Sequence, residues 1–99
     1  MSNPRVFLAC YDRGVTRATE SHDGTWKVDR ALPEFQVTCL TQDPSNPRVV
    51  YAGTREHGVW RSEDRGRTWN EAGLRGQVVK SLAVSPHDSN TLFAGSKPA

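Results

Sequence analysis

The stretch Ser62-Glu63-Asp64-Arg65-Gly66-Arg67-Thr68-Trp69 decides the fold of this chain. Gly66 can adopt the positive φ that a tight hairpin turn requires. The carboxylate of Asp64 can accept hydrogen bonds from nearby backbone N–H groups and close the turn. Thr68 is β-branched and suits the start of a strand, and Trp69 brings a large apolar surface. The stretch therefore predicts a hairpin with a turn held by polar side chains and an exit anchored by an indole.

The pattern Ser-x-Asp-x-Gly-x-Thr-Trp is complete in this stretch and resembles the Asp box, also called the BNR repeat. Its five defining positions are Ser62, Asp64, Gly66, Thr68 and Trp69. In the families that carry the box, it lies at the turn between the third and fourth strands of a β-propeller blade, and its role is structural. These families include sialidases, xyloglucanase-like glycoside hydrolases, sortilin-type receptors and photosystem II assembly factors. The resemblance therefore implies an architecture and leaves the chemistry open.

A degenerate copy of the box precedes the complete one by 43 positions. Its Thr-Trp ending is intact, whereas Ser replaces Asp and Asp replaces Gly at the central positions. The degenerate box consists of Thr19, Ser21, Asp23, Thr25 and Trp26. At a shift of 42, Val37–Pro44 parallels Val79–Pro86. A repeat of about 40–45 residues made of short strands is typical of propeller blades. A β-sandwich with coincidental internal similarity is the alternative.

The strand pattern predicts an all-β chain built from four-stranded antiparallel β-propeller blades, with about two blades present. We expect residues 5–30 to form a partial blade, residues 36–73 a complete blade with the Asp box, and residues 78–95 a second partial blade. Because propellers close with about four to eight blades, this count predicts an incomplete propeller. A truncated piece of a longer protein is the simplest account, and a ring made of several copies is the rival account.

Composition and charge exclude several classes of function. No apolar run approaches the about 20 residues of a membrane span, and no secretory signal precedes the first strand, so we expect a cytoplasmic protein. The net charge of +2 does not indicate nucleic acid binding. Cys10 and Cys39 lack metal-ligand spacing and are expected to be buried free thiols, a disulfide being the alternative in an oxidising compartment. His22, His57 and His87 fall on separate turns, so we expect neither a metal nor a cofactor.

Charged residues gather in the loops that one face of the predicted blades would present. In propeller enzymes that this chain resembles, the loops between the second and third strands, and those between blades, surround the ligand. The residues expected there are Tyr11, Asp12, Arg13, Arg30, Glu34, Arg55, Glu56, His57 and Arg75. Arginine suits the binding of a carboxylate because its guanidinium group is planar and bidentate. Charged side chains are also what ordinary solvated loops contain, so both interpretations stay open.

The sequence favours a repeat scaffold with loops that bind a protein or a carbohydrate, its remaining blades coming from the same protein or from other copies. The alternative is a part of a glycoside hydrolase of the sialidase or xyloglucanase type. A hydrolase needs two carboxylates about 5–10 Å apart, and the loops offer Asp12 and Glu56. The Arg-Ile-Pro segment with the first sialidase arginine is absent, so we assign no catalytic residue. Trp26 and Trp69 are expected to pack between strands, and the role of Trp60 is open.

Overall fold

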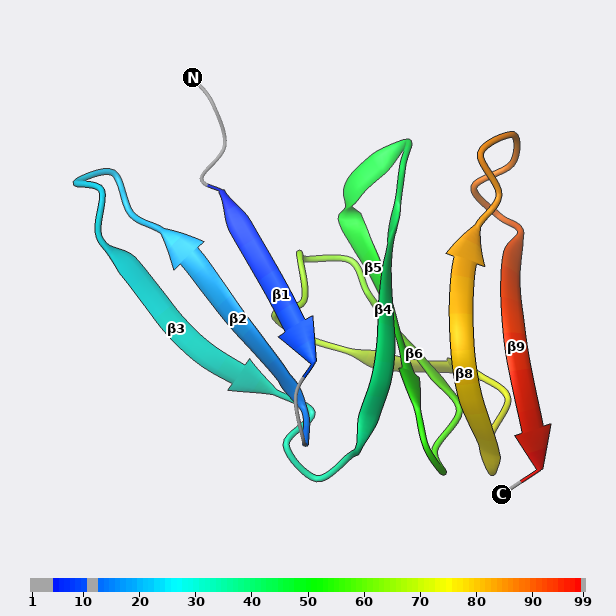
Figure 1. Ribbon diagram of the computed structural model, residues 1–99. Coiled ribbons are helices and arrows are strands. Elements are labelled where there is room, and N and C mark those ends of the chain that lie inside the picture. Colours follow the sequence, from blue (N-terminus) through cyan, green and yellow to red (C-terminus); the bar gives the residue numbers. More distant parts are fainter. Residues whose placement is uncertain (1–4, 11–12, 99) are drawn as a thin grey trace.

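The computed structural model describes residues 5–10 and 13–98, which form three antiparallel sheets (Figure 1). The first sheet contains β1 (Val6–Cys10), β2 (Val15–Glu20) and β3 (Trp26–Ala31). The second contains β4 (Val37–Asp43), β5 (Asn46–Thr54), β6 (Val59–Ser62) and β7 (Asn70–Gly73), and the third contains β8 (Gln77–Val84) and β9 (Leu92–Pro98). Within each sheet every strand pairs with its neighbours in the chain, so the sheets are successive meanders.

The prediction of an all-β chain is confirmed, and the three sheets hold three, four and two strands. Two boundaries differ from the predicted ones. Thr68 does not start a strand, because it is used in the turn, and β7 begins only at Asn70. The third sheet extends beyond residue 95, since pairing between β8 and β9 continues to Pro98. In the described part of the chain, no helix is long and apolar enough to cross a membrane.

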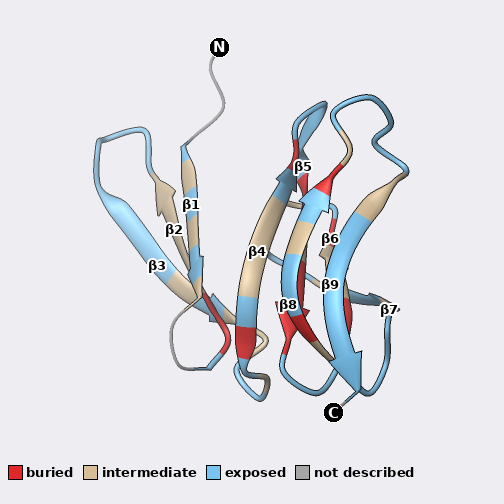
Figure 2. Ribbon diagram, turned by 45° about the vertical axis from the view of Figure 1, so that its right-hand side comes forward, coloured by how far each residue is buried: buried red, intermediate tan, exposed pale blue. Residues whose placement is uncertain are grey.

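Apolar residues between the sheets hold the three meanders together. A buried cluster of Val15, Val37 and Ala52 joins the first sheet to the second, and Leu8, Cys10, Leu32, Leu40, Trp60 and Trp69 pack around it. The third sheet packs on the second at Gly53, where a Cβ would lie 2.7 Å from Cγ1 of Val79. Figure 2 shows most of the buried residues on the second sheet and β8, with a further buried stretch at the start of β2, whereas β3 and β9 are mostly exposed. The core therefore lies around the second sheet.

Asp64 is the centre of the hydrogen bonds in the β6–β7 turn. Its Oδ1 accepts from the amides of Thr68 at 2.8 Å and Arg67 at 3.1 Å, and its Oδ2 accepts from the Thr68 hydroxyl at 2.5 Å. The hydroxyl of Ser62, a fully buried residue, donates to Oδ1 of Asp64 at 2.7 Å. These bonds give partners to turn amides that strand pairing leaves unpaired. The carboxylate therefore performs the turn-closing role that the sequence predicts for it.

Gly66 and Trp69 connect this turn to the first sheet. Gly66 has a φ of 86°, in the left-handed region that favours glycine. Its amide donates to Oγ of Ser62 at 2.8 Å, and its carbonyl accepts from Nε1 of Trp69 at 2.8 Å. A Cβ on Gly66 would lie 2.9 Å from Cδ2 of Leu8 in β1. Because Trp69 also packs against the core cluster, the box holds its own hairpin and the contact between two sheets.

The Asp64 carboxylate is expected to make the stability of the fold depend on acidic pH. Burial raises its pKa, but the hydrogen bonds from Thr68, Ser62 and Arg67 together outweigh burial and lower the pKa to about 2. An unperturbed aspartate titrates at 3.8. The ionised group therefore stabilises the fold fully above pH ~4, and this stabilisation is lost as the pH falls towards ~2. We expect a contribution of roughly 1–2 kcal/mol after screening by solvent.

Urea denaturation of the native chain and of Asp64→Asn at several pH values across this window measures the contribution. Other carboxylates also titrate there, so the informative quantity is the difference between the free energies of unfolding of the two proteins. This difference is expected to shrink as the pH falls, because protonation removes the charge that the variant already lacks. A difference that stays constant with pH would contradict the assignment of a low pKa to Asp64.

The degenerate box forms a shorter turn with a different acceptor. The Ser21 amide donates to the Thr25 carbonyl at 2.7 Å, and Gly24 has a φ of 84°, as in a three-residue hairpin loop closed by a glycine bulge. Oδ1 of Asp23, rather than the hydroxyl of Ser21, accepts from the amide of Thr25 at 3.1 Å and from its hydroxyl at 2.6 Å. The first copy therefore keeps the strand pairing and loses the hydrogen-bond pattern of the complete box.

Trp26 and Trp69 occupy different environments despite their matched places in the repeat. Trp26 is 42% exposed and belongs to β3 itself. Its ring centroid lies 5.5 Å from that of Phe7, and the guanidinium group of Arg5 lies 5.7 Å from its ring. The hydroxyl of Thr19, the first position of this copy, is buried without a hydrogen-bond partner among the described residues. Trp26 thus packs along the surface of the first sheet, not between two sheets.

Candidate functional site

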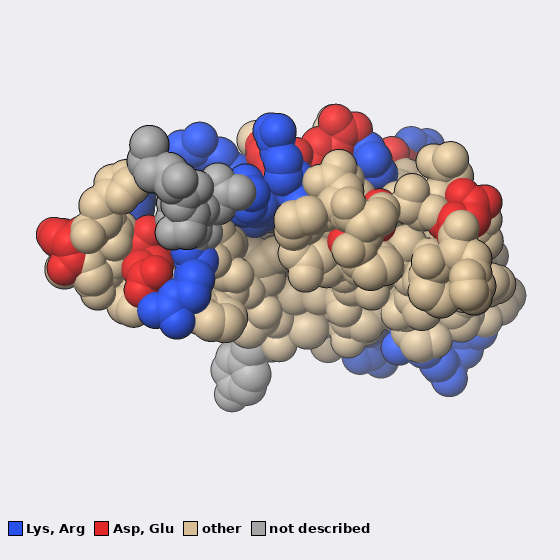
Figure 3. Space-filling view, turned by 90° about the horizontal axis from the view of Figure 1, so that it is seen from above, with Lys and Arg blue, Asp and Glu red and all other residues tan. Residues whose placement is uncertain are grey.

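Loops from different sheets meet at one end of the molecule. The β3–β4 and β5–β6 loops lie at the lower end in Figure 1, and the β4–β5 and β8–β9 turns lie at the upper end. The upper end, seen from above in Figure 3, carries acidic and basic side chains side by side along one edge. The lower end collects most of the described loop residues that the sequence analysis singles out, and it contains a pocket.

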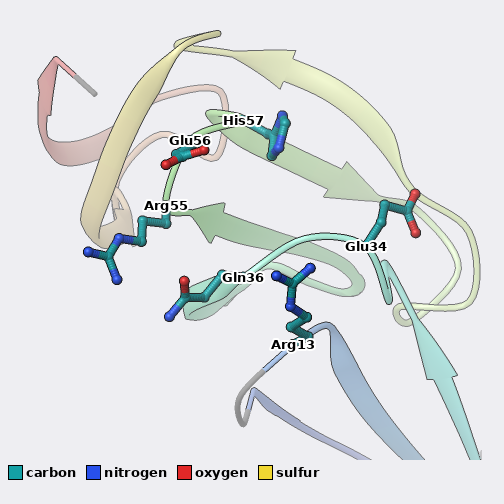
Figure 4. A pocket seen from close by; sticks show the side chains of 6 residues that line it. All are labelled: Arg13, Glu34, Gln36, Arg55, Glu56 and His57. Atoms are coloured by element: carbon teal, nitrogen blue, oxygen red, sulfur yellow. The ribbon is translucent and has the colours of Figure 1, made fainter.

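The pocket at this end has a volume of about 330 Å³ and lies between the first and second sheets (Figure 4). Its lining comes from the segment just before β2, the β3–β4 loop and the β5–β6 loop, with side chains from Arg13, Glu34, Gln36, Arg55, Glu56 and His57. In Figure 4 the guanidinium group of Arg13 points toward the middle of these residues, whereas that of Arg55 extends away from them. All six are exposed polar residues on loops, so the pocket is open and polar.

The β5–β6 loop is fixed by a buried threonine. Thr54 is fully buried, and its hydroxyl donates to the Gly58 carbonyl at 2.8 Å and accepts from the His57 amide at 2.9 Å. The backbone amide of Thr54 donates to the same carbonyl at 3.0 Å. The Arg55 amide donates to the carbonyl of Gln36 at 2.9 Å and so ties this loop to the β3–β4 loop. Backbone hydrogen bonds therefore set the positions from which the pocket side chains extend.

Aromatic rings support the same loops from beneath. The ring centroid of Phe35 lies 4.5 Å from that of His57 and 5.0 Å from that of Trp60. Nε1 of Trp60 donates to the His57 carbonyl at 3.1 Å, and the Phe35 carbonyl accepts from the amide of Gly14 at 2.7 Å. The sequence left the role of Trp60 open. The structure shows that Trp60 both packs against the core and holds the pocket loop. It contributes to the position of the site rather than to its lining.

The structure brings five of the predicted loop residues into the pocket and places Arg30 and Arg75 outside its lining. Arg30 lies beside it, because its guanidinium group donates to the carbonyl of Arg13. Arg75 does not line it and forms an ion pair with Glu71, with Nε 2.7 Å from Oε1. Tyr11 and Asp12 lie outside the described residues. Sequence reasoning missed the pocket residue Gln36, because nothing about an uncharged amide before a strand marks it.

The charged groups of the pocket do not pair with one another. Within residues 5–10 and 13–98, the ion pairs are Arg5–Glu20, Arg17–Asp29, Arg61–Glu63 and Arg75–Glu71. None of them uses a side chain that lines the pocket. Guanidinium and carboxylate groups without protein partners are able to form charge-assisted hydrogen bonds to a ligand. The pocket can therefore offer both strong donors and strong acceptors.

A second pocket of about 450 Å³ continues this surface toward the third sheet. It shares Gln36, Arg55 and Glu56 with the first pocket and adds residues of β4, β8 and β9, namely Thr38, Val78, Lys80, Lys97 and Pro98. Arg55, which extends away from the first pocket, thus lies between the two. The β5–β6 loop therefore stands at the centre of a polar surface that spans all three sheets.

Metal and thiol chemistry have little basis in the described residues. No group of three or more His, Cys, Asp and Glu side chains there is placed to hold a metal ion. Cys10 and Cys39 are free thiols, and both are half-buried. The prediction that they are buried is therefore wrong in degree, because β1 and β4 each lie at the edge of a sheet.

No family model matches the chain, and no curated protein matches its sequence. Function is therefore inferred from the pocket and from the repeat.

Proposed function

We propose that this chain is an Asp-box β-propeller repeat scaffold that presents loops for binding a protein or a carbohydrate. The pocket between the first two sheets carries the binding part of the proposal. The complete box and the three successive meanders support the repeat part. A site assembled from loops on a rigid set of sheets is a common arrangement for recognition, because the strands fix the loops and leave their side chains free.

The chemistry of the lining favours a polar ligand of modest size. Ligand sites commonly have volumes of about 300–1,000 Å³, and this pocket lies at the lower end of that range. Arginine, glutamate, glutamine and histidine supply donors and acceptors that match the hydroxyls of a sugar or the side chains of a peptide.

A part of a glycoside hydrolase is the second candidate. Glu34 and Glu56 line the same pocket, and glycosidases use a pair of carboxylates on either side of the bond that they cleave. Asp12, which the sequence pairs with Glu56, lies outside the described residues. The two candidates differ in turnover, because a hydrolase cleaves nitrophenyl glycosides and a binding scaffold does not.

The binding proposal is tested by screening the chain on immobilised glycans and peptides and then measuring the affinity of each hit by calorimetry. Arg13→Ala is expected to weaken binding by roughly 10- to 100-fold, the effect of losing one charge-assisted hydrogen bond. Arg75→Ala is the matched control, because it removes the same charge from an arginine outside the pocket.

Equal effects of the two substitutions, or no hit among the glycans and peptides, would overturn the proposal. Turnover of a nitrophenyl glycoside that is lost in Glu56→Gln would establish the hydrolase instead. Because circular dichroism reports the fold of each variant separately, a loss of binding through unfolding is recognised directly.

A further inference from the structure

The first sheet carries an apolar face that nothing in the described structure covers. Phe7 pairs with Ala18, and Ala18 pairs with Val28, so these side chains share one face. Trp26 lies two residues before Val28 on the same side, with its ring beside that of Phe7. Phe7 is 60% exposed and Val28 63%. We call Phe7, Ala18, Trp26 and Val28 the outer face of the first sheet; the opposite side of this sheet packs on the second sheet through Leu8.

The third sheet has a matching outer face. Val84 pairs with Leu92 on the side that is turned to the core, and the next pair, Ala83 with Phe93, points the other way. Phe93 is 61% exposed. Gly95, which pairs with Ser81, continues this side of the sheet. We call Ala83, Phe93 and Gly95 the outer face of the third sheet, and β9 is exposed along most of its length in Figure 2.

The repeat shows which of these faces fits the other. At the shift of 43, Phe7 falls on Val50 and Ala9 on Ala52. Val50 and Ala52 are buried, and Ala52 packs against the first sheet through Val15. In the repeat, the outer face of the first sheet therefore corresponds to the side of the second sheet that the first sheet covers.

The outer face of the third sheet is equivalent to the other side of the second sheet. At the shift of 42, Gly53 falls on Gly95 and Tyr51 on Phe93. Gly53 is the position on which Val79 of the third sheet packs. Among the described residues beyond its chain neighbours, an added Cβ at Gly95 would meet only the side chain of Ser81 within 4 Å, so none of the described sheets packs on that position. Gly53 on the second sheet is thus covered by the third sheet, whereas the corresponding position on the third sheet, Gly95, is covered by no described sheet.

We propose that copies of this chain associate head to tail, with the outer face of the third sheet of one copy packed on the outer face of the first sheet of the next. The contact would repeat the one between the second and third sheets, and it would remove large exposed apolar side chains from water. It is heterologous, so it produces rings where the rotation closes and filaments where it does not. The proposal shares the repeat with the proposed function but does not require the pocket to bind a ligand.

Sedimentation velocity of the native chain over a range of concentrations tests the proposal, together with Phe93→Glu and Val28→Glu. The native chain is expected to sediment as species larger than a monomer, and each variant as a monomer, because a buried carboxylate without a partner opposes the contact. Lys27→Glu is the control, because Lys27 is exposed and adjacent to Val28 but lies on the opposite side of β3. The Lys27→Glu variant is expected to associate like the native chain.

An equimolar mixture of Phe93→Glu and Val28→Glu provides the decisive measurement. Each variant keeps the face that the other has lost, so the mixture is expected to form a 1:1 dimer and nothing larger. A monomeric native chain, or a mixture that stays monomeric, would overturn the proposal. Association abolished by only one of the two substitutions would also overturn it, since that result indicates a contact between two identical faces. Circular dichroism verifies that both variants fold, and Phe93→Ser and Val28→Ser replace them if they do not.

Discussion

Replacement of Trp69 by alanine is expected to lower the free energy of unfolding by about 3–5 kcal/mol. The indole packs against the cluster that joins the first and second sheets, so its removal leaves a cavity at that contact. It also removes the Nε1 donor from the Gly66 carbonyl, at 2.8 Å in the box turn. Since small domains are stable by only about 5–15 kcal/mol, much of the stability of the chain would be lost.

Urea denaturation followed by far-UV circular dichroism measures this loss without depending on indole fluorescence. Trp69→Phe keeps most of the apolar surface and removes the donor, so we expect a smaller cost of roughly 1–2 kcal/mol. Trp26→Ala makes the same change in the degenerate box, where the indole is 42% exposed, and it is expected to cost about 1 kcal/mol. Similar losses for Trp69→Ala and Trp26→Ala would show that the two tryptophans are equivalent after all. Low protein concentration separates these effects from those of association.

The arrangement of the strands could be predicted because its signals are local. Hairpin turns depend on a few residues close in sequence, such as Asp64 and Gly66, and their chemistry is visible without knowledge of the fold. The repeat then placed the remaining strands by comparison with that turn. The same comparison does not show which residue of the degenerate copy is the acceptor. The two copies have the same spacing, but the first has a shorter turn because strand pairing continues to Glu20 and Trp26. The acceptor there is Asp23, two residues after the aligned Ser21.

The candidate site was only partly predictable because contacts distant in sequence hold it together. The tie between the amide of Arg55 and the carbonyl of Gln36, and the packing of Phe35 on His57, join loops from different strand pairs. Charge marked Arg55 and other exposed loop residues as candidates, but it marked Arg75 equally, although Arg75 is paired with Glu71 outside the pocket. Sequence shows which side chains are polar, and the fold determines which of them meet.

Gly58→Ala is expected to lower the free energy of unfolding by about 2–5 kcal/mol, the second large effect. Gly58 has a φ of 72°, which is unfavourable for alanine by about 1–2 kcal/mol. A Cβ there would lie 2.3 Å from the carbonyl oxygen of Gly73 and 2.5 Å from that of Leu74. Both atoms belong to the backbone, so they cannot move aside as the end of a side chain can, and such overpacking costs about 1–3 kcal/mol more.

Gly24→Ala is the matched control for this prediction. Gly24 has a φ of 84°, but apart from its own chain neighbours no atom of the described residues lies within 4 Å of the position that a Cβ would occupy. Its substitution therefore carries the backbone cost alone, about 1–2 kcal/mol. The difference between the two variants in urea denaturation isolates the steric contact at Gly58. Equal losses would show that β6 and β7 can separate at no cost.

The Gly58 carbonyl accepts both hydrogen bonds from Thr54. Its displacement is therefore also expected to release the loop that carries Arg55 and His57. As a result, Gly58→Ala is expected to weaken ligand binding, whereas Gly24→Ala is not.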